Sequence, residues 1–199
     1  MTAPANEMRP GRLSAFTDGV VAIIITIMVL ELPVPHGDNW AALRPVLPLF
    51  GAYALSFVNV GIFWVNHHHM FHLAKVIDGR VLLANLFLLF WLSLVPFVIR
   101  WVGEAGISPI TVAAYGVVLV MASLAYLLIE RAIIAAEGRQ SALDDALGSK
   151  NKEILSLLLY AIAVPLAFVW LWGSIAIYLL VALYWLIPDR RVEEVLPPP

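Results

Sequence analysis

Cysteine is absent from this chain of 199 residues, and its absence excludes disulfide bonds, iron–sulfur clusters and catalysis by a thiol. Charge is scarce as well: Asp, Glu, Lys and Arg make up only 13% of the residues, whereas a soluble globular domain has about 25%. The formal net charge of -2 argues against a surface that binds nucleic acid. The sequence also lacks a glycine-rich phosphate-binding loop and paired carboxylates within its apolar stretches. We therefore expect neither an enzyme nor a nucleic-acid partner.

Hydrophobic sequence is what the chain has in abundance, at 62% of its residues. A helix that crosses a bilayer needs about 20 mostly apolar residues, and we assign six stretches to membrane spans. The predicted spans cover residues 13–33, 43–71, 80–100, 109–131, 154–170 and 172–188. The sequence therefore predicts an all-α integral membrane protein in which residues 1–199 form one six-helix unit.

The connections between the predicted spans are short, with one exception. A tight turn at residues 171–173 joins the fifth and sixth spans into a hairpin. Residues 132–153 form the only long connection, which we interpret as a cytoplasmic linker with a helical extension, and residues 189–199 form a cytoplasmic tail. No internal repeat is present, which argues against a transporter built from inverted repeats.

Basic residues are distributed unevenly over the two sides of the predicted bundle. Ten of the twelve Lys and Arg residues fall on the side that holds both termini, and only Arg44 and Arg100 fall on the other. Cytoplasmic loops carry an excess of Lys and Arg. We therefore expect a multi-pass membrane protein with both termini in the cytoplasm.

Asp18, at the start of the first predicted span, is the most informative residue. An ionisable group inside a span is costly and is a functional-site hypothesis by default. At 100° per residue, Ile23, Ile27 and Leu30 share one stripe of the helix with Thr26 at its border, and Asp18 points nearly the opposite way. Such a stripe predicts either a hydrophobic constriction in a pore or an ordinary face against lipid or another helix.

The second and third predicted spans supply polar partners for Asp18. Trp64, His67 and His68 lie at the end of the second span and Asn85 lies near the start of the third, so all have the same predicted depth. Carboxylate, indole, imidazole and carboxamide groups can satisfy one another there. We expect a polar network that holds the first helix against the other two. The alternative is that Asp18 only caps the start of its helix, where the dipole favours an anion.

Histidines follow one another at His67–His69, and His72 comes one turn later. His68 and His72 have a spacing that suits a metal ligand pair, while histidines at a membrane face can also respond to pH. The remaining histidine, His36, lies on the opposite side, so an opposing ligand for haem is missing. We predict no metal and no cofactor, and keep a haem or metal membrane protein as an alternative.

The motif Arg12-x-x-x-Phe16-Thr17-Asp18, followed by an apolar helix, resembles the signature of the transmembrane protein 175 family of lysosomal and prokaryotic potassium channels. Two later motifs are similar to the family's second and third helices: Phe63-Trp64-x-x-His67-His68-x-x-Phe71, and Asn85 followed by Leu94-Val95-Pro96-Phe97. The resemblance covers about residues 12–97. Thr17 stands where the family usually has serine and keeps the hydroxyl, and His69 stands where related sequences often carry arginine.

The resemblance implies a potassium-preferring cation channel without a carbonyl selectivity filter. It implies a homotetramer in a prokaryotic plasma membrane, with four first helices around the pore, so that potassium ions, lipid and further copies of the chain are the partners. By the same resemblance, Ile23 is expected to form the main constriction, and Ile27 and Leu30 are expected to form further pore-facing layers. The hydroxyl of Thr26 is expected to help to select potassium. The residues that match the family's interhelical polar network are Arg12, Phe16, Thr17, Asp18, Trp64, His67, His68 and Asn85. A channel that conducts protons is the alternative within this class.

Overall fold

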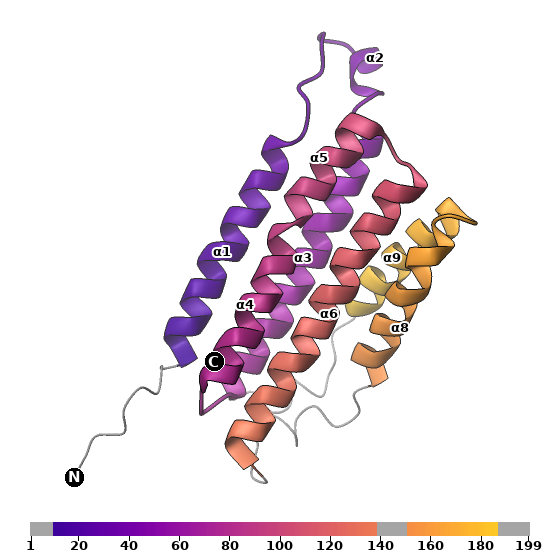
Figure 1. Ribbon diagram of the computed structural model, residues 1–199. Coiled ribbons are helices and arrows are strands. Elements are labelled where there is room, and N and C mark those ends of the chain that lie inside the picture. Colours follow the sequence, from indigo (N-terminus) through magenta and orange to yellow (C-terminus); the bar gives the residue numbers. More distant parts are fainter. Residues whose placement is uncertain (1–9, 139–150, 187–199) are drawn as a thin grey trace, which may run out of the picture.

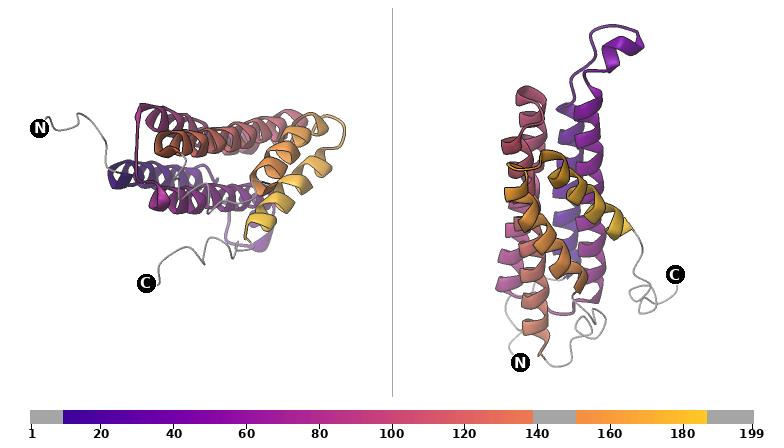
Figure 2. Two further views of the ribbon diagram at one scale, coloured as in Figure 1. Left: turned by 90° about the horizontal axis from the view of Figure 1, so that it is seen from below. Right: turned by 90° about the vertical axis from the view of Figure 1, so that its right-hand side faces the viewer.

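The computed structural model describes residues 10–138 and 151–186, which form helices and no strands. The helices are α1 (Pro10–Leu30), α2 (Trp40–Leu43), α3 (Leu47–Leu73), α4 (Gly79–Ser93), α5 (Val95–Ala105), α6 (Pro109–Glu137), α8 (Asn151–Leu166) and α9 (Leu171–Leu186). The long helices lie side by side with alternating direction, and α8 and α9 pack beside α6 (Figures 1 and 2). The end of the bundle where α1 ends and α3 begins is called the upper end, as in Figure 1, and the opposite end the lower end.

Four segments are long and apolar enough to cross a membrane, namely Gly11–Leu30, Leu47–Leu73, Gly79–Ala105 and Pro109–Glu137. The third of these combines α4 and α5. The remaining long helices, α8 and α9, have 16 residues each, which is a length of about 24 Å at the helical rise and less than the roughly 30 Å of a hydrocarbon core. The described residues therefore form a multi-pass, all-helical membrane protein with four candidate spans.

The third predicted span is one apolar run in the sequence and two helices in the structure. Leu94 separates α4 from α5, and Pro96 lies in the first turn of α5. Proline has no N–H to donate, and its ring collides with the carbonyl four residues earlier in a continuous helix. The helical segment nevertheless goes on to Ala105, five residues beyond the predicted end.

The predicted turn between the last two helices is wrong by four residues. The chain turns at residues 167–170 instead of 171–173, shortly after Pro165 in the last turn of α8. Gly173 lies buried inside α9, where a Cβ atom would stand 2.6 Å from Cδ2 of Trp170. This glycine permits close packing of an aromatic ring and does not form a turn.

The predicted linker 132–153 begins with a continuation of α6, which stays helical to Glu137. Oε1 of Glu137 accepts a hydrogen bond of 2.6 Å from the backbone N–H of Lys75, so the end of α6 is held to the connection between α3 and α4. Residues 139–150 and the predicted tail 189–199 lie outside the described residues.

The described basic residues at the helix ends separate as the charge pattern predicts. Lys75 and Arg80 flank the connection between α3 and α4 at the lower end, whereas Arg44 follows α2 and Arg100 lies in α5 toward the upper end. Five further basic residues lie outside the described ranges, namely Arg9, Arg139, Lys150, Arg190 and Arg191. The orientation of the bundle in its membrane stays a prediction.

α6 forms the centre of the bundle, in contact with α4, α5, α8 and α9. At Gly116 it approaches α8 and α9 so closely that an added Cβ atom would collide with the Tyr178 hydroxyl and lie 2.9 Å from Cγ2 of Val164. Tyr178 has little room to withdraw, because it is buried and its hydroxyl donates to the Val112 carbonyl at 3.2 Å.

We expect Gly116→Ala to destabilise the protein by about 1–3 kcal/mol, since an overpacked core forces neighbours to shift. Replacing glycine by alanine in an unobstructed helix would instead stabilise it by up to about 1 kcal/mol. The matched control is Gly61→Ala in α3, where nothing lies within 4 Å of the new Cβ. Thermal unfolding in detergent measures the difference, and equal melting of the two variants would show that Tyr178 yields easily.

Candidate pore face and polar network

α1 has one buried face and one exposed face. The buried face contacts α3, α4 and α5 and consists of Leu13, Thr17, Val21, Ile24 and Met28. The predicted stripe lies on the exposed face: Ile23, Ile27 and Leu30 are 57%, 40% and 79% exposed. In both figures of the whole chain, α1 stands at the edge of the described bundle. The face on which the pore prediction rests is therefore available to surroundings outside this subunit.

Thr26 also lies on the exposed side of α1. Its hydroxyl donates to the carbonyls of Ala22 (3.0 Å) and Ile23 (2.9 Å), one turn earlier in the same helix. The hydroxyl hydrogen is thus occupied within the helix, whereas the oxygen keeps lone pairs that can accept a hydrogen bond or contact a cation.

The side-chain amide of Asn85 joins three helices in the buried interior. Its Nδ2 donates to Oγ1 of Thr17 in α1 at 3.0 Å, and its Oδ1 lies 2.8 Å from Nε2 of His67 in α3. A carbonyl oxygen can only accept, so His67 must carry its proton on Nε2. All three side chains are at most 1% exposed.

The other ring nitrogen of His67, Nδ1, has no hydrogen-bond partner among the described residues. The imidazole stacks on Phe71, with ring centroids 4.2 Å apart. The ring is therefore fixed by one hydrogen bond and by packing on an aromatic face.

A second link between α1 and α3 lies beside this amide. Nε1 of Trp64 donates to Oδ1 of Asp18 at 2.8 Å. Asp18 lies eight residues after Pro10, the first residue of α1, so the alternative that it caps the start of the helix is wrong. These links and the Asn85 bonds together form the hydrogen-bonded network, which consists of Thr17, Asp18, Trp64, His67 and Asn85.

Three residues of the predicted network make no hydrogen bond to these five within residues 10–138 and 151–186. Arg12 is exposed, and Phe16 lies on the exposed side of α1 with the predicted stripe. His68 is exposed too, with its ring centroid 6.0 Å from that of Trp64. In the described part of the chain, the histidines form no group of three or more metal-ligating side chains with one another or with acidic residues.

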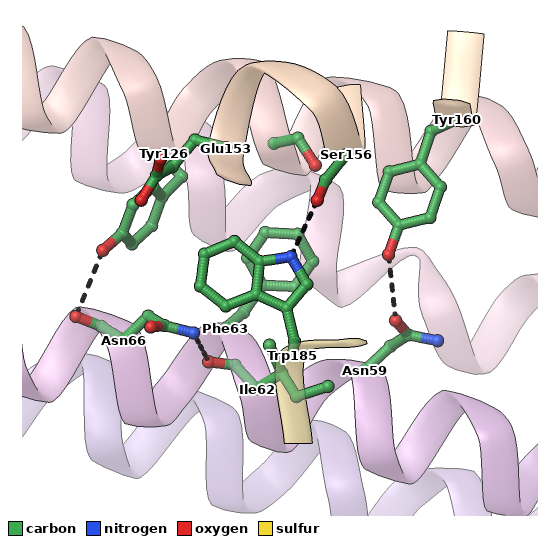
Figure 3. Close-up of a pocket in the computed structure, with 10 residues that line it drawn as sticks. Asn59, Ile62, Phe63, Asn66, Tyr126, Glu153, Ser156, Tyr160 and Trp185 are labelled. Carbon is green, nitrogen blue, oxygen red and sulfur yellow. Dashed lines mark hydrogen bonds between the residues drawn. The ribbon is translucent and has the colours of Figure 1, made fainter. Parts of the chain in front are cut away.

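A polar cluster that the sequence analysis missed lies on the far side of α3 (Figure 3). Oδ1 of Asn59 accepts from the Tyr160 hydroxyl at 3.3 Å, and its Nδ2 donates to the Tyr115 hydroxyl at 3.1 Å. Nε1 of Trp185 donates to Oγ of Ser156 at 2.8 Å. The sequence contains one signal for this cluster, namely Asn59 inside an apolar run. A buried amide in a span needs hydrogen-bond partners on neighbouring helices.

Figure 3 shows a small cavity among these side chains, where the Tyr126 hydroxyl also donates to the Asn66 carbonyl at 3.3 Å. Its volume of about 30 Å³ has room for one water molecule. The bonds of the cluster join α3 to α6 and to α8, and join α8 to α9. Their role is to hold these helices together.

The upper end of α1 is attached in a weaker way. Nε of Arg100 in α5 lies 4.0 Å from Oε2 of Glu31, just after α1, and 2.9 Å from Oε1 of Glu104. The Arg100 side chain is 63% exposed, and exposed ion pairs contribute about 1 kcal/mol at most. The buried bonds near the lower end therefore determine where α1 sits.

The family model for the endosomal/lysosomal potassium channel TMEM175 matches residues 12–96. A protein of Chryseobacterium sp. (strain P1-3), named as a potassium channel, is 51% identical over 187 residues, which cover 94% of this chain and 97% of that protein. The chain belongs to the TMEM175 family.

Two further TMEM175 comparisons extend this result. The crystal structure of a lysosomal potassium-selective channel TMEM175 homologue from Chamaesiphon minutus matches with a TM-score of 0.70 and 28% identity, over 92% of this chain and 97% of that one. The human protein named endosomal/lysosomal proton channel TMEM175 is 38% identical over 92 residues, which cover 40% of this chain and 18% of that protein.

The stretch matched by the TMEM175 model runs from Arg12 to Pro96 and contains both the exposed stripe of α1 and the whole hydrogen-bonded network. α6, α8 and α9 lie outside it. The family pattern thus coincides with the pore-helix candidate and its attachment. The fold and the family establish a multi-pass membrane protein of a cation-channel class.

We expect Thr17→Val to destabilise the protein by about 1–3 kcal/mol, because it leaves the buried Nδ2 of Asn85 without its acceptor. Thr17→Ser keeps the hydroxyl and serves as the matched control. Thermal unfolding in detergent compares the two. If both variants melt at the same temperature, the Thr17–Asn85 hydrogen bond does not hold α1 in place.

Proposed function

We propose that the chain is a potassium-preferring cation channel, and that it acts as a homotetramer whose pore is lined by α1. Membership of the TMEM175 family and the potassium-channel name of its bacterial relative support this function. The observation that carries the pore assignment is the exposed apolar stripe on α1, which lies on a different side of the helix from the buried face that Thr17 attaches to Asn85.

Four copies of α1 around one axis would bring their Ile23, Ile27 and Leu30 side chains toward each other. Methyl groups provide no oxygen ligands, so an ion must either keep its water or cross a dry constriction at high cost. Such a ring gates by size and wetting, with Ile23 as the main layer. The stripe would then be a hydrophobic gate without a carbonyl selectivity filter.

Selectivity for potassium is assigned to Thr26 and to backbone dipoles. The Thr26 hydroxyl donates its hydrogen to its own helix, which leaves lone pairs for a partly dehydrated cation. One oxygen per subunit replaces only part of a hydration shell, so discrimination between potassium and sodium should be modest. No cofactor or enzymatic reaction is part of this proposal.

The proposed topology includes α8 and α9 as the fifth and sixth spans of a single unit over residues 1–199. The positive-inside rule then puts both termini, the linker 132–153 and the tail 189–199 in the cytoplasm, and the plasma membrane is the proposed location. Helices shorter than the hydrocarbon core are accommodated by local thinning of the bilayer or by assembly.

Proton conduction is the second candidate, because the human relative is named a proton channel. The hydrogen-bonded network also contains two titratable side chains, Asp18 on the proposed pore helix and His67 on the neighbouring α3. A proton pathway would not need the constriction to admit a hydrated ion.

The proposal predicts potassium flux above sodium flux in liposomes that contain the purified protein. Outward gradients of each ion, with and without a protonophore, separate ion flux from proton flux, because the protonophore supplies the compensating proton current. Empty liposomes and heat-inactivated protein are the controls. Proton flux in the absence of both metal ions, with no potassium flux, would replace the potassium channel by the proton channel.

We expect Ile23→Asn to raise potassium flux, because an amide at the narrowest layer favours water in the constriction. The matched control is Val29→Asn on the same helix, a residue that is also exposed (46%) but lies off the stripe. Single-channel recording in planar bilayers compares both variants with the wild type. Conductance and open probability that Ile23→Asn leaves unchanged would remove Ile23 from the gate.

A further inference from the structure

A large cavity lies among α3, α5, α6 and α9, and no residue of α1 lines it. Its volume is about 470 Å³, which is within the range of sites for small organic ligands. Leu47, Pro48 and Gly51 contribute the wall from α3, and Trp172, Ile175 and Tyr178 contribute the wall from α9. The cavity is thus distinct from the proposed pore and from the small cavity of Figure 3.

The short hairpin of α8 and α9 explains why this space exists. Each of its helices has 16 residues, against 27 in α3 and 29 in α6. The turn between α8 and α9 lies lower than the upper ends of α3 and α5 in Figure 1 and in the right-hand view of Figure 2. The upper parts of α3 and α5 therefore face a region that α9 does not fill.

The cavity is open to the surroundings of the bundle, because Leu47, Pro48, Gly51 and Trp172 of its lining are exposed. Water does not suit it. Ordered water needs two to four polar partners, and three of the lining hydroxyls already donate their hydrogens to backbone carbonyls. Ser56 donates to the Ala52 carbonyl at 2.8 Å, Thr111 to the Gly106 carbonyl at 3.1 Å, and Tyr178 to the carbonyl of Val112 at 3.2 Å. The rest of the lining is almost entirely apolar, so the space is suited to hydrocarbon.

We propose that the cavity binds an acyl chain of a membrane phospholipid. The lining belongs to helices of a membrane protein, so lipid tails are the hydrocarbon at hand. The rim carries complementary charge for a phosphate group: Leu47 and Pro48 are the first two residues of α3, whose N-terminus has no side-chain cap, and the exposed Arg44 comes three residues before Leu47. Pro48 has no N–H, and the N–H of Leu47 donates to the Arg44 carbonyl, so the guanidinium of Arg44 is the group that would bind the phosphate.

The proposal does not depend on ion conduction or on the oligomeric state. In this proposal, α9 of the α8–α9 hairpin forms one wall of a lipid site on the side of the bundle away from α1. The bound chain would complete the packing between α3, α5 and α9.

Gly51→Trp tests the proposal by filling the cavity. A Cβ atom at Gly51 meets nothing within 4 Å, and the same holds at Gly61, which lies on the same helix and does not line the cavity. Gly61→Trp is therefore the matched control. The full-length variants are purified in a non-ionic detergent, mixed with palmitoyl-oleoyl-phosphatidylglycerol and analysed by native mass spectrometry.

We expect the wild type and Gly61→Trp to retain one more phosphatidylglycerol per subunit than Gly51→Trp. Equal lipid counts in all three proteins, or a wild type that carries detergent instead of lipid, would overturn the site. Ile175→Trp narrows the same cavity from α9 and gives a second reading, which decides the matter if Gly51→Trp does not yield folded protein.

Discussion

The buried amide of Asn85 is the constraint on which the arrangement of α1 depends. In a membrane, apolar side chains are satisfied by lipid and by protein alike, so hydrophobicity alone does not select which face of a helix turns inward. An amide that bonds Thr17 and His67 at once can be satisfied in only one rotation of α1. That rotation buries the Thr17 face and leaves the face of Ile23 exposed. The polar bonds therefore determine which surface α1 presents outside its own subunit.

The residues that attach α1 and the proposed pore-facing residues are separated along the helix as well as around it. Thr17 and Asp18 bond to α4 and α3 in the lower half of the helix, whereas Ile23 and Leu30 lie in the upper half. A similar buried attachment is found on the other side of the bundle, where the Tyr160 hydroxyl in α8 donates to Asn59 in α3. In both places, buried amides and hydroxyls specify helix contacts that apolar packing would leave ambiguous.

The sequence predicted much of this arrangement because its signals are local or few. Helical periodicity assigned the stripe of α1, and the scarcity of polar residues in the spans left Asp18, Trp64, His67 and Asn85 few partners except one another. Errors arose where tertiary contacts decide the outcome. Glycine is typical of turns, but Gly173 lies inside α9, where the Trp170 ring leaves no room for a side chain. The bonds of Asn59 and the cavity above α9 depend on how α8 and α9 pack, which no local pattern encodes.

The unequal anchoring of α1 limits how a pore built from it can change. Its lower half is held by the buried hydrogen bond between Thr17 and Asn85, and breaking that bond leaves polar groups unsatisfied in the membrane interior. Its upper half is held by apolar contacts of the buried Ile24 and Met28 and by the exposed Arg100 beside Glu31 at 4.0 Å, an ion pair that is worth about 1 kcal/mol at most. Any change in width that keeps the Asn85 amide intact must therefore come from the part of α1 beyond Asp18. That part contains Ile23, Thr26 and Leu30, so the proposed gate residues lie where α1 is held by apolar packing and not by buried hydrogen bonds.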